Sequence, residues 1–182
     1  MKPILYTITV HSENEVGLLN QISIIFTRRK LNIESLSVSA SAIKGVHKFV
    51  ITTMCDEDMV VKVVKQIEKR IDVIRAFYYT DDEIVYQEVA LYKISTPRML
   101  ELDGIEGFVR KHNARILEVH PAYTIIEKSG HTEETQALFE ELSKYGVLQF
   151  VRSGRVSITK STIEHVDCYL ESQERRRLEM EE

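Results

Sequence analysis

The sequence predicts an α+β protein of two ferredoxin-like sandwich domains, each with the element order βαββαβ. Over residues 4–79, apolar residues recur with the period of two typical of strands and with the period of three to four typical of helices, in that order of elements. An acidic, polar interruption follows, and the same order then repeats over residues 85–151. We therefore expect one domain at residues 1–80 and a second at residues 81–160. Residues 161–182 are expected to form a charged helical or frayed tail.

The first domain shows the plan most clearly. Apolar and polar residues alternate over residues 4–10, where β-branched residues are frequent, and this predicts a strand. From Leu18 apolar residues recur at three- and four-residue steps, as on one face of a helix. A hairpin is predicted over residues 33–54. The acidic run at residues 56–58 begins a second helix, because carboxylates favour its positive end, and residues 73–79 form the last strand.

The second domain follows the same order less regularly. Pro97 suits the first turn of one short helix that extends to about Val109. Ser129 and Gly130 are expected to form a turn before the next helix. The expected elements are strands at residues 85–95, 115–119, 122–127 and 147–151, with helices beginning at Thr96 and Thr132.

Composition excludes several classes of protein. The 182 residues are 43% hydrophobic and 29% charged, which is typical of ordinary globular domains. A formal net charge of -4 argues against a nucleic-acid partner, which requires a broad basic face. Two distant cysteines suggest neither a disulfide framework nor a metal site. No apolar stretch is long enough to span a membrane and no signal peptide is visible, so a cytoplasmic location is expected.

The turn before the first predicted helix is a candidate small-molecule site. The first turn of a helix leaves about four backbone N–H groups without internal partners, and these favour a carboxylate. Gly17 permits close approach to the backbone, Asn14 occupies the expected N-cap position, and Asn32 offers both a donor and an acceptor. These groups suit an α-amino acid. The same residues equally fit an ordinary capped turn without a ligand, so the local pattern leaves both interpretations open.

Longer runs of the chain, over about residues 3–160, resemble the regulatory (small) subunit of acetohydroxyacid synthase, also called acetolactate synthase. The Asn-Ile-Glu-Ser-Leu run at residues 32–36 is specific to this family within the wider group of ACT domains. The chain departs from the family at Lys160-Ser161, where the family often has Arg-Gly, and its tail matches no family segment. The runs that carry the resemblance are residues 14–19, 29–38, 73–75, 88–94 and 152–156.

The resemblance implies a function and a site. In this family the N-terminal ACT domain binds a branched-chain amino acid, usually valine, between two paired ACT domains, which implies a homodimer. The subunit activates the catalytic (large) subunit and makes it sensitive to feedback inhibition, without catalytic residues or cofactors of its own. Thiamine diphosphate, Mg²⁺ and FAD are implied for the catalytic partner. The residues that match the family's ligand contacts are Asn14, Gly17, Leu18, Leu19, Asn32 and Ile33.

Other interpretations stay open at this point. A free-standing ACT-domain amino-acid sensor without an enzyme partner is the main alternative, although no basic helix-turn-helix supports a DNA-binding version. A small enzyme is disfavoured because no nucleophile with a base, and no acid–base pair, can be assigned. His11 is expected to be a solvated residue at a strand end, with assistance to ligand binding as the second possibility. The tail is either a solvated helix or a docking element for the partner.

Overall fold

The computed structural model describes residues 3–102 and 104–163, and residues 166, 169, 171, 172 and 175. The predicted tail falls mostly on residues outside this described set. Contacts divide the chain into two units, residues 1–85 with 157–182, and residues 86–156. The chain therefore returns to the first unit at residue 157, which we had placed in the second domain.

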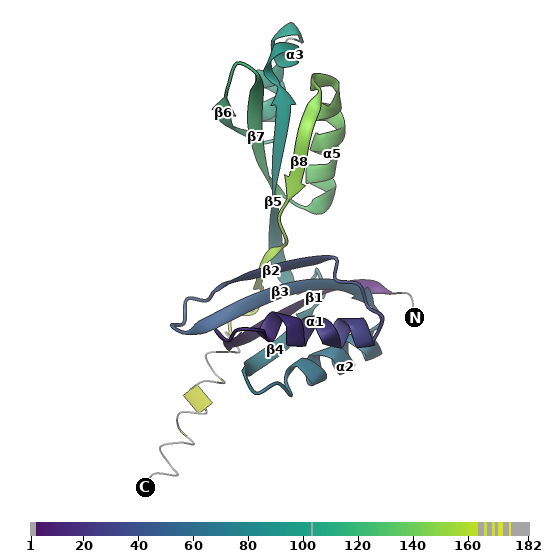
Figure 1. Cartoon of the computed structure of the whole chain (residues 1–182), viewed down its shortest axis with the longest axis vertical. Helices are drawn as coiled ribbons and strands as arrows, with labels where there is room; N and C mark the ends of the chain where they lie inside the picture. Colours follow the sequence, from purple (N-terminus) through teal and green to yellow (C-terminus); the bar gives the residue numbers. More distant parts are fainter. Residues whose placement is uncertain are drawn as a thin grey trace. The chain divides into compact units, whose positions relative to one another are not determined.

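The first unit is a four-stranded antiparallel sheet in the order β2-β3-β1-β4. Helices α1 and α2 lie on one face of this sheet (Figure 1). This order and the helices on one face confirm the predicted ferredoxin-like plan. The elements are β1 (Ile4–Glu13), α1 (Leu18–Arg28), β2 (Ser35–Ala40), β3 (Val46–Cys55), α2 (Glu57–Ile67) and β4 (Val73–Tyr79).

The core of the first unit follows from the two periods in the sequence. Tyr6, Ile8 and Val10 alternate along β1 and are buried against the helices. The apolar stripe of α1, which includes Ile22 and Phe26, packs into the same core. The predicted capping acid at the start of α2 is confirmed, since the Met59 N–H donates to the Asp56 carboxylate at 2.8 Å.

The opposite, helix-free face of the first sheet is also covered. Thr7, Thr9 and His11 alternate with the core residues of β1, yet their exposed fractions are 0%, 5% and 8%. Thr9 and His11 line a cavity together with residues of the segment 157–162 and Val166. The expectation of a solvated His11 is therefore wrong, because a distant part of the chain covers this strand end.

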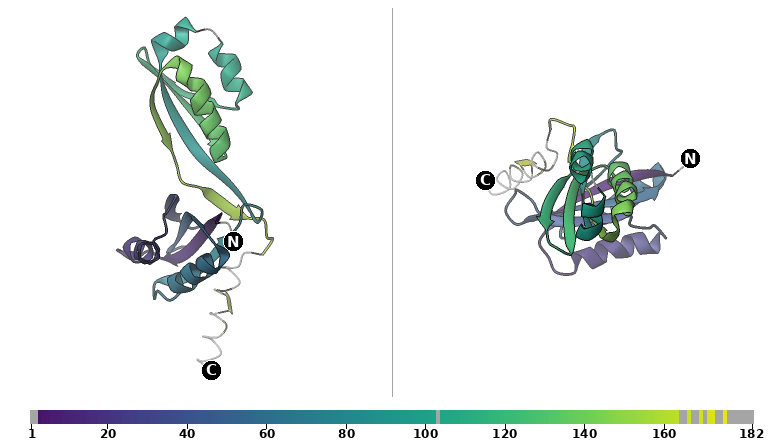
Figure 2. Two further views of the ribbon diagram at one scale, coloured as in Figure 1. Left: turned by 90° about the vertical axis from the view of Figure 1, so that its right-hand side faces the viewer. Right: turned by 90° about the horizontal axis from the view of Figure 1, so that it is seen from above.

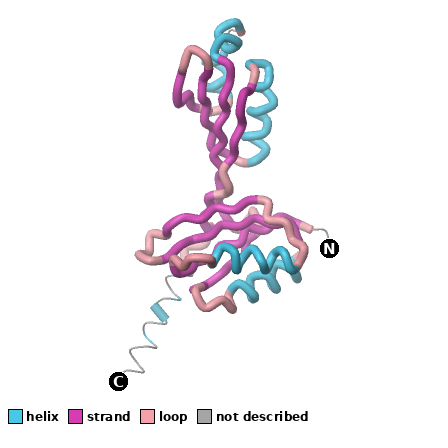
Figure 3. The backbone as a smooth tube through the Cα atoms, in the orientation of Figure 1, coloured by secondary structure: helices cyan, strands magenta, loops and turns pink. Residues whose placement is uncertain are grey.

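The second unit repeats the plan of the first. Its sheet has the order β6-β7-β5-β8, and β9 pairs with β5 outside that path. In Figure 2 (left) its helices lie on one side of the sheet, and Figure 3 shows the same arrangement of helices and strands. The elements are β5 (Ile84–Ser95), α3 (Thr96–Glu101), α4 (Ile105–Lys111), β6 (Arg115–Val119), β7 (Tyr123–Gly130), α5 (Thr132–Leu142), a 3₁₀ turn (Ser143–Tyr145) and β8 (Val147–Arg152). β9 (Val156–Thr159) begins at the last residue of this unit and continues in the first.

Two predictions for the second unit are wrong in detail. The single helix expected after Pro97 is two helices, because Leu102 is extended and Gly104 has φ +101° at the start of α4. Ser129 and Gly130 do not form a turn but end β7, where they pair with β5. Helix α5 begins directly afterwards at Thr132, and the N–H of its N-cap residue His131 donates to the Glu134 carboxylate at 2.8 Å.

Tyr92 gives the second unit a sensitivity to alkaline pH. The ring is fully buried, its hydroxyl donates to the Thr135 carbonyl at 2.6 Å, and burial raises the pKa of the phenol to about 12. Because the folded-state pKa lies above the ordinary value of about 10, this stabilisation is complete below pH 10 and is lost between about pH 10 and 12. The loss amounts to at most about 2–3 kcal/mol.

We expect Tyr92→Phe to lower the free energy of unfolding by about 0.5–1.5 kcal/mol at pH 8, since one buried hydrogen bond is removed. Between pH 10 and 12 the variant should lose less stability than the parent chain. Urea unfolding followed by circular dichroism across this range measures both effects. Equal alkaline losses in the two proteins would contradict the role of Tyr92.

Candidate functional site

The turn before α1 exposes backbone donors. Gly17 is the N-cap residue of α1 with φ +88°, a left-handed conformation that favours glycine, and no side chain caps the helix. The prediction of Asn14 as the N-cap is therefore wrong, since Asn14 lies three residues earlier. No atom lies within 4 Å of a Cβ added at Gly17, so the space beside this backbone is open.

The two leucines that follow Gly17 have different roles. Leu18 is 1% exposed, its side chain belongs to the core, and its N–H already donates to the Glu15 carbonyl at 3.5 Å. Leu19 is 43% exposed, and Val16 in the turn is fully exposed. By helix geometry the N–H groups in this first turn, including that of Leu19, lack intrahelical acceptors. The turn thus combines polar backbone donors with an apolar rim.

The second predicted group, Asn32 and Ile33, follows the end of α1. The helix ends in a Schellman motif, in which the N–H groups of Lys30 and Leu31 donate to the Thr27 and Phe26 carbonyls, both at 3.0 Å. This motif directs the chain towards β2, and Ile33, two residues before that strand, packs against the core.

The loop that carries Asn32 is held against β3. Thr53 Oγ1 donates to the Asn32 carbonyl at 2.7 Å. The Asn32 side chain is exposed and its Nδ2 donates to Glu34 Oε1 at 3.0 Å.

Within one chain, these two groups lie at opposite ends of the sheet. Asn32 is fixed beside Thr53, which pairs with Tyr6 near the start of β1. Asn14 follows Glu13 at the end of β1. The length of β1 from Tyr6 to Glu13 corresponds to about 24 Å. A single amino acid therefore cannot contact both groups of the same chain.

A buried charge cluster in the second unit was missed by the sequence reasoning. The Glu88 carboxylate lies 3.7 Å from Arg155 Nε and 3.6 Å from Arg152 Nε, and accepts a hydrogen bond from Thr132 Oγ1 at 2.8 Å. The guanidinium of Arg155 stacks 3.7 Å from the centre of the Tyr86 ring. Glu88 and the two arginines belong to two runs that carry the family resemblance, residues 88–94 and 152–156. The structure brings these two runs together.

Among the residues that the structure describes, no three His, Cys, Asp or Glu side chains form a group able to hold a metal ion. None of the helices described is both long enough and apolar enough to cross a membrane.

Comparisons with known proteins match both units. Residues 8–75 match the family model described as an AHAS small subunit-like ACT domain, and residues 87–161 match that described as the small subunit of acetolactate synthase. The acetolactate synthase small subunit of Aquifex aeolicus is 30% identical over 155 residues, covering 85% of this chain and 81% of that protein. The chain belongs to the acetolactate synthase small-subunit family. The resemblance identified from the sequence is confirmed.

Further relatives agree with this assignment. The Bacillus subtilis acetolactate synthase small subunit is 30% identical over 156 residues, covering 85% of this chain and 90% of that protein. A crystal structure of the small subunit from Thermotoga maritima superposes with a TM-score of 0.79 at 23% identity, covering 88% of this chain and 99% of that chain. This structural likeness confirms the fold of the small subunit.

Proposed function

We propose that this small subunit binds and activates the catalytic subunit of acetolactate synthase and confers feedback inhibition by valine. Family membership supports the regulatory role. The observation that carries the effector site is the open, uncapped N-terminus of α1 at Gly17. Its backbone donors suit the carboxylate of an amino acid, and the exposed Leu19 and Val16 suit a branched apolar side chain.

A second copy of the chain completes the site in this proposal. β2 is an edge strand, so it presents unpaired backbone groups that a second β2 can meet. β2 begins at Ser35, near Asn32, and ends at Ala40. Ala40 pairs with His47 of β3, and His47 pairs with Ser12 of β1, so the end of β2 is level with the end of β1. Antiparallel pairing about a two-fold axis would set the start of one β2 beside the end of the other. Asn32 of each chain then approaches the Gly17 turn of its partner.

The other edge of the sheet, β4, does not offer this arrangement. Pairing there would place β2, and with it Asn32, at the outer edges of a continuous eight-stranded sheet, away from the partner's Gly17 turn. A valine held between paired β2 edges would stabilise one placement of the two chains. That placement would be communicated to the catalytic subunit with a coupling free energy of about 1–3 kcal/mol. The catalytic subunit would carry thiamine diphosphate, Mg²⁺ and FAD, and this chain would carry none of them.

An acetolactate assay tests the proposed function directly. The purified catalytic subunit is assayed with and without the full chain, and each mixture is titrated with valine, leucine and isoleucine. Higher activity with the chain, and inhibition by one of these amino acids only in its presence, is expected. Unchanged activity together with no physical association would favour the alternative of a free-standing amino-acid sensor.

Asn32→Ala is expected to weaken valine binding by about 1–3 kcal/mol, because the ligand's charged group would lose a hydrogen-bond partner. Isothermal titration of the full chain measures the change in Kd. Glu34→Gln is the control, since it retains the contact to Asn32 Nδ2 and leaves Asn32 in place. An unchanged Kd for Asn32→Ala would remove this residue from the site.

A further inference from the structure

The outer surface of helices α1 and α2 is strongly basic. Residues 18–30 and 57–70 contain seven Lys or Arg and three Asp or Glu, whereas the whole chain has a formal net charge of -4. Lys62 and Lys65 are exposed on the side of α2 opposite its buried stripe, and Lys69 continues this row just after the helix ends. We call this surface the basic face, and its residues are Arg28, Arg29, Lys30, Lys62, Lys65 and Lys69.

Arg29 joins the basic residues at the end of α1 to those of α2. Its Nη2 donates to Gln66 Oε1 at 2.6 Å, across the two helices that lie side by side in Figure 1. Gln66 belongs to α2, with Lys62 one turn before it and Lys69 one turn after it. The basic residues of the two helices therefore form one continuous surface.

The positive charge of the basic face is uncompensated within the described part of the chain. None of its six residues forms an ion pair with an acidic residue there. The sequence of α1 contains no Asp or Glu, and the acids of α2 are confined to its first turn, at Glu57 and Asp58. Glu68, just after α2, instead pairs with Arg75 at 3.1 Å. An acidic partner would supply the missing counter-charges.

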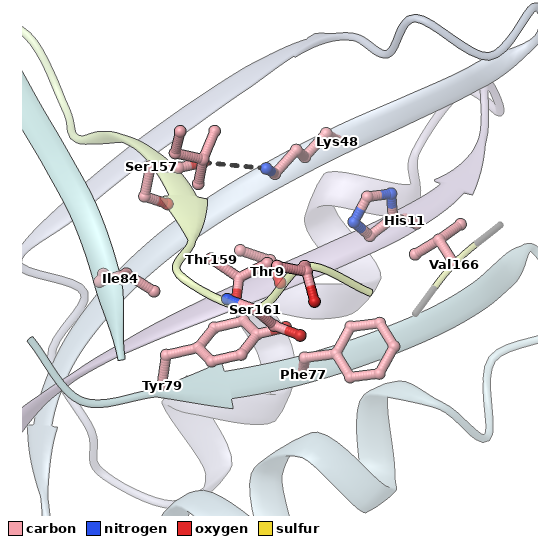
Figure 4. Close-up of a pocket in the computed structure, with 12 residues that line it drawn as sticks. Thr9, His11, Lys48, Phe77, Tyr79, Ile84, Ser157, Thr159, Ser161 and Val166 are labelled. Carbon is pink, nitrogen blue, oxygen red and sulfur yellow. Dashed lines mark hydrogen bonds between the residues drawn. The ribbon is translucent and has the colours of Figure 1, made fainter. Parts of the chain in front are cut away.

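The basic face stays accessible in the proposed dimer. The opposite, helix-free face of the sheet is covered by the segment that returns at residue 157, where Lys48 Nζ donates to the Ser157 carbonyl at 3.0 Å (Figure 4). Antiparallel pairing of two β2 edges uses a two-fold axis perpendicular to the sheet, so both helical layers would lie on the same side. The dimer would then present two basic faces on one side, and their separation would depend on the placement of the two chains.

We propose that the basic face docks on an acidic surface of the catalytic subunit. This inference rests on the proposed function, which requires the two subunits to associate. A partner that contacts both basic faces of a dimer would respond to the placement of the two chains, which valine sets in that proposal. Because the remainder of the chain is acidic, it would repel an extended polyanion such as nucleic acid, whereas a protein can confine its carboxylates to a patch of matching size.

Charge reversal on α2 tests this docking surface. Association of the labelled full chain with the purified catalytic subunit is measured by fluorescence anisotropy, and the parent chain should bind at least about tenfold more weakly at about 300 mM than at about 50 mM KCl. The combined variant Lys62→Glu, Lys65→Glu and Lys69→Glu should weaken association by at least about tenfold at the lower salt concentration. Replacing the same three residues with Gln keeps the helix propensity, and should give a smaller loss of the same kind if the Glu variant does not fold.

A second set of charge reversals is the matched control. Lys44, Arg110 and Lys144 are exposed outside the basic face, and changing all three to Glu alters the net charge by the same amount. This control should associate like the parent chain. Equal weakening in the two triple variants would overturn the inference, and so would undiminished association of folded Glu and Gln variants of α2. If the parent chain itself does not associate with the catalytic subunit, the proposed function fails and this inference fails with it.

Discussion

Replacing Gly17 with Asp is expected to abolish valine inhibition while activation of the catalytic subunit is retained. The introduced carboxylate would occupy the open space beside the first turn of α1 and repel the carboxylate of the ligand. Two like charges about 4–8 Å apart at an effective dielectric constant of 20 repel by about 2–4 kcal/mol. The expected result is a rise of at least about 30-fold in the Kd for valine.

Gly17→Asn is the matched control for this experiment. Asn and Asp have nearly the same shape, and both tolerate the left-handed backbone conformation found at φ +88° better than other side chains. The two variants should therefore share any loss of stability and differ in valine affinity. Normal inhibition of the Asp variant by valine would remove the Gly17 turn from the effector site.

Replacing Glu88 with Ala should cause the largest loss of stability of any variant considered. The Glu88 side chain is 7% exposed and lies between Arg152 and Arg155, and the latter is 5% exposed. Removing the carboxylate takes away the acidic group that lies between these two guanidinium groups, and breaking a buried ion pair in this way typically costs about 3–5 kcal/mol. Urea unfolding of the full chain, followed by circular dichroism, should show this loss in the transition of the second unit.

An exposed ion pair in the same unit provides the comparison. Glu141 lies 3.2 Å from Lys111, and their side chains are 41% and 65% exposed. Because solvent screens this pair, Glu141→Ala should cost less than about 1 kcal/mol. Equal losses for Glu88→Ala and Glu141→Ala would show that the charges around Glu88 are solvated.

The sequence predicted the fold well because its signals are local. A period of two along β1 and a period of three to four along α1 arise from the geometry of each element, so the order of the elements could be inferred without knowledge of their packing. The start of α1 was less certain, since Asn14 and Gly17 are both residue types found at helix starts. The backbone conformation at Gly17 decides between them.

The features that the sequence did not predict depend on segments far apart in the chain. Thr9 and His11 alternate with core residues in the way that is typical of a solvated strand face. The residues from 157 onward cover them, and nothing in the sequence of β1 predicts this. The separation of Asn32 from the Gly17 turn likewise follows from strand register. The local sequence pattern identified both the Gly17 turn and Asn32 as candidates. Only the register of the sheet shows that the two lie far apart within one chain.

The most direct measurement mixes two defective chains. Gly17→Asp and Asn32→Ala chains are unfolded and refolded together, at a valine concentration to which neither variant responds alone. If each site combines the Gly17 turn of one chain with Asn32 of its partner, every mixed dimer contains one intact site. Random pairing then restores about a quarter of all sites, and valine binding reappears. If the site lay within a single chain, no intact site would form and the mixture would bind no more valine than the separate variants, which would contradict the account.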